Sequence, residues 1–188
     1  MNIAVLWSSP NLNGLTGTAK EKVVAGLRAY GAQVDEIHLN HLHLEHCRAC
    51  GDGWGICRAK GECVLKDDFA DVYRRLVDAD GIVFISAVYW HDLTECMKAF
   101  LDRLRRCEAG HNGYLQGKRC LLVACAGGTG RGATECLYKL EQTLVHMEMR
   151  AYDRLSVIRY NKDYMLDTLE QAGRLYADRI ANGFDMQF

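Results

Sequence analysis

Short apolar runs and segments of helical period alternate along the chain in a regular order. Runs rich in aliphatic residues are typical of buried strands and occur at residues 3–7, 33–39, 81–86, 119–126 and about 155–158. Apolar residues at three- and four-residue spacing predict the intervening helices, at about 16–30, 69–77, 92–107, 133–149 and 163–181. Strands alternating with helices in this way predict a doubly wound α/β domain, a parallel sheet covered by helices on both faces.

Residues 41–66 show neither period and form a long irregular excursion. Four cysteines lie in it, separated by two, six and five residues: Cys47, Cys50, Cys57 and Cys63. Glycines between them allow tight folding, so the thiolates can converge on one metal ion or cluster. The alternative is that they are ordinary, partly buried cysteines. The segment precedes a helix capped by Asp67 or Asp68, and we expect it to lie over the carboxyl edge of the sheet.

Composition narrows the class of protein. The 188 residues suit a single domain, residues 1–188, and the apolar content of 49% with 25% charged residues is globular. A net charge of -1 argues against binding nucleic acid or a membrane surface. No apolar run approaches a membrane span, and the N-terminal residues lack a signal-peptide pattern, so we expect a cytoplasmic protein. Nine cysteines then indicate reduced thiols, metal ligands or redox chemistry; we expect the five outside the excursion to lie in the core.

Ligands of doubly wound sheets bind beyond the carboxyl ends of the strands, so the loops after the first, third and fourth strands are candidates. The first of these loops reads SSPNLNGLTGTA and precedes a helix. Hydroxyls, side-chain amides and the positive end of the helix dipole predict an anion site there. The loop lacks the GxxxxGK[ST] and GxGxxG patterns, so a phosphate monoester fits better than a nucleoside triphosphate or dinucleotide. The alternative is a plain capped turn.

Several motifs together resemble those of the flavodoxin-like NADPH-dependent FMN reductases and, within them, the iron-sulfur flavoproteins. The resemblance covers roughly the first 130 residues. It rests on the S-P-x-x-x-G-x-T loop at 9–16, the cysteine segment before Asp67 and Asp68, Ala79-Asp80-Gly81, Val88-Tyr89 and the KAFLDR stretch at 98–103.

This resemblance implies a flavodoxin-like five-stranded sheet of order 2-1-3-4-5, noncovalently bound FMN, and assembly into homodimers or homotetramers. The phosphate loop falls on Ser9, Asn11, Asn13, Gly14, Leu15 and Thr16. The loop against the flavin ring falls on Ala87, Val88, Tyr89 and Trp90, and a third loop on Ala126, Gly127, Gly128 and Gly130. For Tyr89 and Trp90 the alternative is a hydrophobic plug at the strand end.

The chain departs from the family at three places. Asn11 stands where a basic residue is usual, and Ala87 stands where proline is usual. Iron-sulfur flavoproteins have a CxxCxxC pattern followed by a fourth cysteine, whereas the interval from Cys50 to Cys57 is enlarged here to GDGWGI. Three alternatives remain for the cysteines: a [4Fe-4S] cluster, a closed tetrahedral zinc site, or free thiols with Trp54 on a mobile lid over the flavin.

Three functions are therefore considered. The first is an FMN-dependent oxidoreductase that takes hydride from NAD(P)H and reduces a quinone, free flavin or other small acceptor, with no catalytic side chain because the flavin does the chemistry. The second is an iron-sulfur flavoprotein that exchanges single electrons with a ferredoxin-type partner through Cys47, Cys50, Cys57 and Cys63. The third is a zinc- or thiol-based sensing module without flavin, which leaves the phosphate-type loop unexplained.

Overall fold

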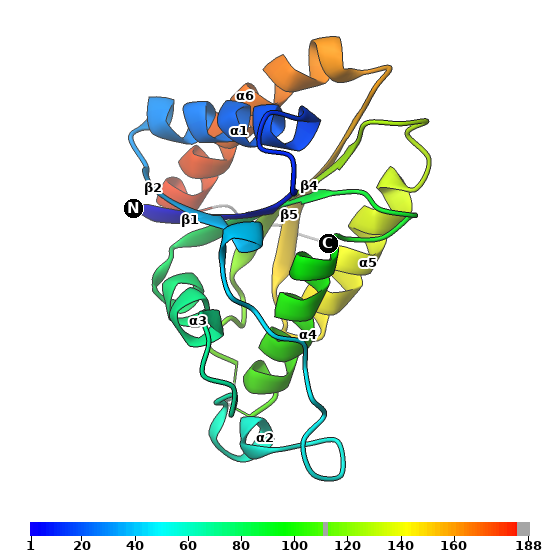
Figure 1. Ribbon diagram of the computed structural model, residues 1–188. Helices are drawn as coiled ribbons and strands as arrows, with labels where there is room; N and C mark the ends of the chain where they lie inside the picture. The colour runs from blue at the N-terminus through cyan, green and yellow to red at the C-terminus, as the bar shows by residue number, and fades with distance from the viewer. Residues whose placement is uncertain (111–112, 184–188) are drawn as a thin grey trace.

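A five-stranded parallel sheet forms the centre of the computed structural model, which describes residues 1–110 and 113–183 (Figure 1). The strands stand in the order β2-β1-β3-β4-β5. Their bounds are β1 Asn2–Ser8, β2 Gln33–His38, β3 Gly81–Ala87, β4 Arg119–Ala126 and β5 Arg150–Ile158. The predicted doubly wound fold and strand order are confirmed.

Helices cover both faces of this sheet, and a short 3-10 turn, η1, follows β2 at Leu39–His41. The helices are α1 Leu15–Tyr30, α2 Ile56–Lys60, α3 Phe69–Asp78, α4 Glu95–Glu108, α5 Ala133–Val145 and α6 Lys162–Asn182. Figure 1 shows α1 and α6 side by side on one face, with α3, α4 and α5 on the other. No helix within residues 1–110 and 113–183 is long and apolar enough to cross a membrane.

Each face of the sheet has its own hydrophobic core, because side chains alternate along a strand. In β1, Ile3 and Val5 pack with α1 and α6, whereas Ala4 and Leu6 pack with the opposite layer. Both sets are fully buried. This two-sided burial explains why the strands appear in the sequence as continuous apolar runs instead of alternating ones.

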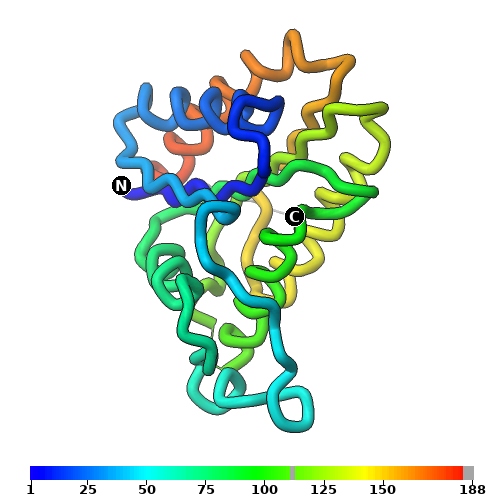
Figure 2. The backbone as a smooth tube through the Cα atoms, in the orientation of Figure 1, coloured from blue at the N-terminus to red at the C-terminus, as the bar shows by residue number. Residues whose placement is uncertain are grey.

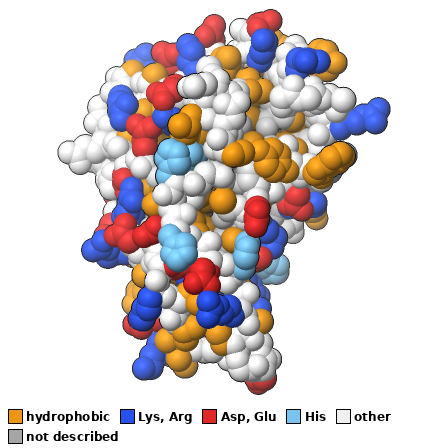
Figure 3. Space-filling model, viewed as in Figure 1, with side chains coloured by type: hydrophobic (Ala, Val, Ile, Leu, Met, Phe, Trp, Pro, Cys, Tyr) orange, Lys and Arg blue, Asp and Glu red, His pale blue; other side chains and the backbone are white. Residues whose placement is uncertain are grey.

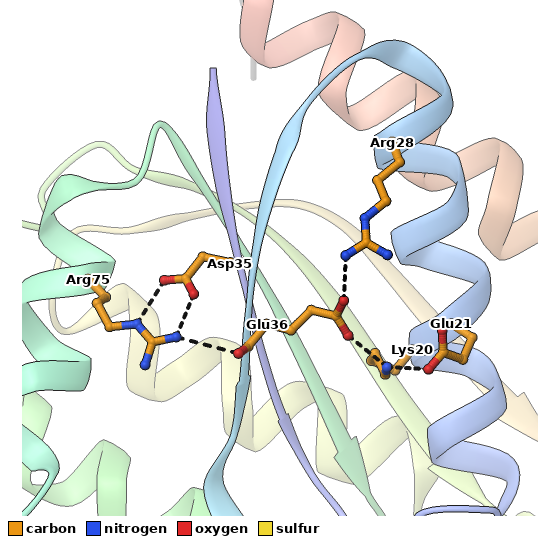
Figure 4. A network of polar contacts seen from close by, with 6 residues as sticks. All are labelled: Lys20, Glu21, Arg28, Asp35, Glu36 and Arg75. Atoms are coloured by element: carbon orange, nitrogen blue, oxygen red, sulfur yellow. Dashed lines mark hydrogen bonds and ion pairs between the residues drawn. The ribbon is translucent and has the colours of Figure 1, made fainter.

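The edge strand β2 is held by ion pairs on both of its faces (Figure 4). Asp35 accepts a hydrogen bond of 2.8 Å from Arg75 Nε on α3. Glu36 points the other way and binds Lys20 Nζ and Arg28 Nη2 of α1, each at 2.7 Å. These contacts occupy Lys20, whose ammonium group lies 5.4 Å from the centre of the Trp7 ring near the end of β1.

The structure differs from the predicted elements at several places. Helix α5 ends at Val145 and β5 begins at Arg150, whereas the helix was expected to reach 149 and the strand to begin at about 155. The helix expected at 92 begins at Glu95, because residues 89–92 form a tight turn. A five-residue helix, α2, lies within the excursion that was expected to be irregular. Asp68 occupies the N-cap position of α3, yet its carboxylate accepts the amide of His43 at 2.7 Å and caps no helix. The cap predicted at Asp68 is therefore wrong, whereas Asp67, the other residue expected to cap, accepts the amide of Phe69, the first residue of α3, at 3.3 Å.

Candidate functional site

Three loops meet at the carboxyl edge of the sheet, and they are the ones that the sequence singled out. They follow β1, β3 and β4 and lie together in the upper right half of the molecule (Figure 2). Strand order reverses between β1 and β3, which pair directly. Such a reversal is where doubly wound proteins bind ligands.

The first loop folds on itself through short side-chain contacts. Asn11 N donates to Ser9 Oγ at 3.3 Å, and Asn13 N donates to Asn11 Oδ1 at 3.1 Å. His38 Nε2 donates to the Ser9 carbonyl at 2.9 Å and thereby ties the loop to β2. A Cβ on Gly17 would lie 2.0 Å from the Leu12 carbonyl oxygen, so this close approach requires glycine.

Helix α1 begins at this loop without a side-chain cap. Its N-cap residue is Gly14, and its first turn holds no acidic residue. The amides of Leu15, Thr16 and Gly17 therefore have no acceptor within the helix or from a cap. The Thr16 hydroxyl is buried and turned toward the Cys125 thiol. The free donors at this helix end are thus backbone amides, as an anion site requires.

A buried polar network joins the strand ends beneath the three loops. The Ser8 hydroxyl donates to Asn40 Oδ1 at 3.0 Å and contacts the Thr94 hydroxyl. Thr94 N donates to Ser86 Oγ at 3.2 Å, and Thr94 Oγ1 caps α4 by accepting the Met97 amide. The network holds β1, β3 and α4 in one arrangement.

The second loop is a tight hairpin turn with two residues in the left-handed region. Tyr89 and Asp92 exchange backbone hydrogen bonds of 2.9 Å, and the residues between them, Trp90 and His91, have φ of 49° and 66°. Side chains disfavour this conformation, which usually belongs to Asn-Gly. Trp90 is 95% exposed, so it does not plug the strand end. The turn presents an indole ring to the solvent at the carboxyl edge.

The third loop leaves open space beside its backbone. A Cβ on Gly127 or Gly128 would meet nothing within 4 Å. Gly132, in contrast, packs against the second loop, since a Cβ there would lie 2.6 Å from His91 Cα. The second and third loops are therefore in direct contact.

The cysteine segment does not lie over this edge, and that prediction is wrong. Its helix α2 packs against α4, and Figures 1 and 2 show the segment running from the middle of the molecule to its lower end, where α2 lies. Arg103, Arg106 and Cys107, from the last two turns of α4, line the same cavity as the cysteines. The start of α4, which faces the three loops, is about 16 Å away along the helix axis, at a rise of ~1.5 Å per residue.

Cys47, Cys50, Cys57 and Cys63 all line one cavity. The donor set suits a cluster or zinc, but the arrangement does not fit either group. The cavity that they line has a volume of about 20 Å³, room for one water molecule. Within residues 1–110 and 113–183, no three His, Cys, Asp or Glu side chains are placed to share a metal ion.

Trp54, in the enlarged interval, lies against the far end of α4 and not over the carboxyl edge. Its ring is 4.9 Å from the guanidinium of Arg106, with Arg58 and Arg105 slightly farther away. Arg106 also donates to the Gly53 carbonyl. The alternative of a Trp54 lid over the flavin is therefore wrong.

Sequence reasoning missed two contributors to the cysteine cavity, Arg103 and Cys107. They stand four residues apart on α4, the spacing that puts two side chains on one helix face. Burial, together with the neighbouring Cys63 and Cys57, raises the pKa of the Cys107 thiol to about 12. Cys107 therefore belongs to the core, as expected, and is also the fifth cysteine that lines this cavity. Cys96, also expected in the core, is only half-buried and accepts from Asn40 Nδ2 at 3.5 Å.

Arg103 forms a buried ion pair at the base of the cysteine segment. It binds both carboxylate oxygens of Asp67 and the Glu45 carbonyl, while Asp67 accepts the Glu45 amide. Burial acts to raise the pKa of Asp67, but Arg103 and the two backbone amides lower it to about 2. Since Glu45 precedes Cys47 and Asp67 follows Cys63, the pair attaches both ends of the segment to α4.

The strand order, the reversal between β1 and β3 and the three loops together define a flavodoxin-like protein. A family model described as NADPH-dependent FMN reductase matches residues 1–162. The chain accordingly belongs to the NADPH-dependent FMN reductase family.

Similar proteins include curated iron-sulfur flavoproteins of archaea. One from Archaeoglobus fulgidus is 29% identical over 70% of this chain and 57% of its own length. One from Methanocaldococcus jannaschii is 28% identical over 79% of this chain and 73% of its own length. The chain thus matches little more than half of the first of these relatives. A solved structure, the NAD(P)H:quinone oxidoreductase from Methanothermobacter marburgensis, has the same fold, with a TM-score of 0.72, 18% identity and coverage of 94% and 96% of the two chains.

Proposed function

We propose that this protein is an FMN-dependent oxidoreductase that takes hydride from NAD(P)H and passes electrons to a small acceptor such as a quinone or free flavin. FMN supplies the redox chemistry when bound. The uncapped start of α1, at the reversal of strand order, carries the proposal, because it offers free backbone amides to a phosphate.

The predicted site residues have distinct parts in this proposal. Gly14, Leu15 and Thr16 would hold the phosphate through their amides, while Ser9, Asn11 and Asn13 keep the loop in shape. The turn at Ala87, Val88, Tyr89 and Trp90 would lie along one side of the flavin ring, and its aromatic side chains can stack. The third loop, with Ala126, Gly127, Gly128 and Gly130, would approach the ring with bare backbone.

We also propose that the chain assembles into a homodimer or homotetramer. Leu12, Tyr89 and Trp90 are 48%, 47% and 95% exposed around the candidate site. Hydrophobic side chains gather on this side of the molecule in Figure 3. Exposed apolar patches of this kind are typical of interaction surfaces.

Two measurements test the proposed oxidoreductase. Titration of the purified protein with FMN should quench flavin fluorescence, and the loaded protein should oxidise NADPH or NADH in the presence of benzoquinone. As a control, Gly17→Ala drives a Cβ into the Leu12 carbonyl and should lose FMN binding. A wild-type protein that remains colourless after incubation with FMN contradicts the proposal.

A second candidate function is an iron-sulfur flavoprotein with a [4Fe-4S] cluster on Cys47, Cys50, Cys57 and Cys63. It is supported by the shared cavity of the four thiols and by the names of the relatives. Its difficulty is the small volume of the shared cavity, about 20 Å³. Protein purified without oxygen should be assayed for iron, zinc and acid-labile sulfide. Four irons with sulfide per chain would establish this second function; one zinc without sulfide would favour a structural metal, and no metal would leave the thiols free.

A further inference from the structure

A cavity of about 330 Å³ extends the candidate site toward the C-terminal part of the chain, beyond the residues that the sequence suggested. The start of α1 lines one wall with Gly14, Leu15 and Thr18, and Gly127 of the third loop contributes to it. The opposite wall comes from the end of β5 and the start of α6, where Arg159 and Lys162 stand. Two cationic side chains therefore face the uncapped end of α1.

Neither cation has a counter-charge. Within the described part of the chain, the side chains of Arg159 and Lys162 take part in no hydrogen bond or ion pair. Both are exposed, and the one acidic residue in the first turn of α6, Asp163, is exposed as well. The side chain of Asn161, the N-cap residue of α6, does not cap the helix, because it binds Ile158 N at 2.7 Å and the Ser156 carbonyl at 3.0 Å.

The position of these cations is unfavourable without a ligand. The start of a helix carries the positive end of its dipole, where cations are repelled and anions are stabilised. Lys162 is the first residue of α6, and Arg159 lies just before it. The starts of α1 and α6 and the side chains of Arg159 and Lys162 thus meet at one cavity. An anion bound there would compensate the positive ends of both helix dipoles and both cationic side chains.

The first loop has no cationic side chain of its own that could neutralise a bound phosphate. Residues 8–19 contain neither lysine nor arginine, and the next basic residue, Lys20, is already bound to Glu21 and Glu36 (Figure 4). The Lys20 side chain is 9% exposed. The positive charge that a phosphate dianion requires must therefore come from another part of the chain.

We propose that Arg159 and Lys162 bind the dianion of a phosphate monoester at the start of α1. The inference rests on the proposed FMN-dependent function, and it names the residues that replace the family's basic residue, absent at Asn11. Two ligands of that function carry such a group: the 5′-phosphate of FMN and the 2′-phosphate of NADPH. Their shared chemistry, about two negative charges near pH 7, is what the two side chains would recognise.

The test compares Arg159→Gln, Lys162→Gln and the double variant with Arg174→Gln. The control removes the same charge from an exposed side chain of α6, about 18 Å along the helix at ~1.5 Å per residue. Dissociation constants for FMN and riboflavin are measured by fluorescence at one ionic strength, and KM is measured for NADPH and NADH. Circular dichroism and thermal melting confirm that each variant is folded.

If the cations hold FMN, the double variant should bind FMN on the order of 10- to 100-fold more weakly, while riboflavin binding stays within about twofold. If they hold NADPH, FMN binding is unchanged and KM rises on the order of tenfold or more for NADPH but not for NADH. Folded variants equal to Arg174→Gln in all four measurements overturn the inference.

Failure of the proposed function gives a different result. In that case the wild-type protein binds neither FMN nor riboflavin. Calorimetry with adenosine 2′-monophosphate on the same variants then decides the anion site by itself. Binding that is lost in the double variant supports the site, and its absence from the wild-type protein rejects it.

Discussion

Arg103 and Asp67 form an ion pair whose side chains are each 1% exposed, with Nη1···Oδ2 at 2.6 Å and Nη2···Oδ1 at 2.8 Å. The pair closes the base of the cysteine segment, because Glu45 binds both partners through its backbone. The Arg103 guanidinium also lies 4.3 Å from the centre of the Phe69 ring. Arg103 lines the cysteine cavity, and its Nε is buried and has no hydrogen-bond partner. From α4, Arg103 thus contacts both the cysteine segment, at Glu45, and the first residue of α3, Phe69.

Removing one partner of this pair should destabilise the protein strongly. Asp67→Asn or Arg103→Met leaves an uncompensated buried charge, which costs about 3–5 kcal/mol of unfolding free energy. The double variant Asp67→Leu/Arg103→Met should regain at least half of that loss, because it buries no unpaired charge. Urea denaturation measures all three. Single variants that lose less than about 1 kcal/mol would show that the pair is not a structural clamp.

Stability should fall in acid because of Asp67. The folded-state pKa of about 2 lies below that of the unfolded chain, so the contribution is complete above the unfolded pKa and disappears as pH falls through the folded pKa. A shift of this size corresponds to about 2 kcal/mol. Unfolding free energies measured between pH 6 and pH 3 should fall more steeply for the wild type than for Asp67→Asn. Parallel curves would contradict the assignment.

The turn at Trp90 and His91 should trade stability against activity. Replacing it with Asn-Gly, by Trp90→Asn and His91→Gly together, puts residues that tolerate the left-handed region at both positions and should stabilise the protein by about 1 kcal/mol. Turnover with NADPH should fall several-fold, since the aromatic side chain beside the proposed flavin is lost. His91→Gly alone is the matched control, with a stability gain and near-normal turnover. Full activity in the double variant would remove Trp90 from the proposed site.

Trp54 should protect the cysteines from modification. Its contacts with Arg58, Arg105 and Arg106 hold the enlarged interval on α4. Trp54→Ala should therefore raise local opening, and alkylation of Cys50 and Cys57 by iodoacetamide should become about tenfold faster. Trp90→Ala removes an indole at the other end of α4 and should leave these rates unchanged. Mass spectrometry resolves each cysteine, and equal rates in both variants would show that Trp54 does not hold the segment.

The elements of the fold follow from local patterns in the sequence. Runs such as residues 119–126 are apolar throughout because β4 is buried on both faces, and that strand has the predicted bounds. Helix ends were less well predicted where a side chain has a tertiary partner. Asp68 looked like a cap, but it binds His43, and no local pattern signals a contact 25 residues away.

The sequence by itself determined the parallel sheet and the meeting of the three loops, since parallel strands place their carboxyl ends at one edge. It also brought four cysteines into one segment. Only the tertiary structure decided where that segment lies, because its direction depends on the contact of Arg103 with Asp67, 36 residues apart. The same holds for Arg159 and Lys162, which reach the start of α1 only when α6 packs beside it. Periodicity encodes which face of an element is buried, but not which distant side chains meet.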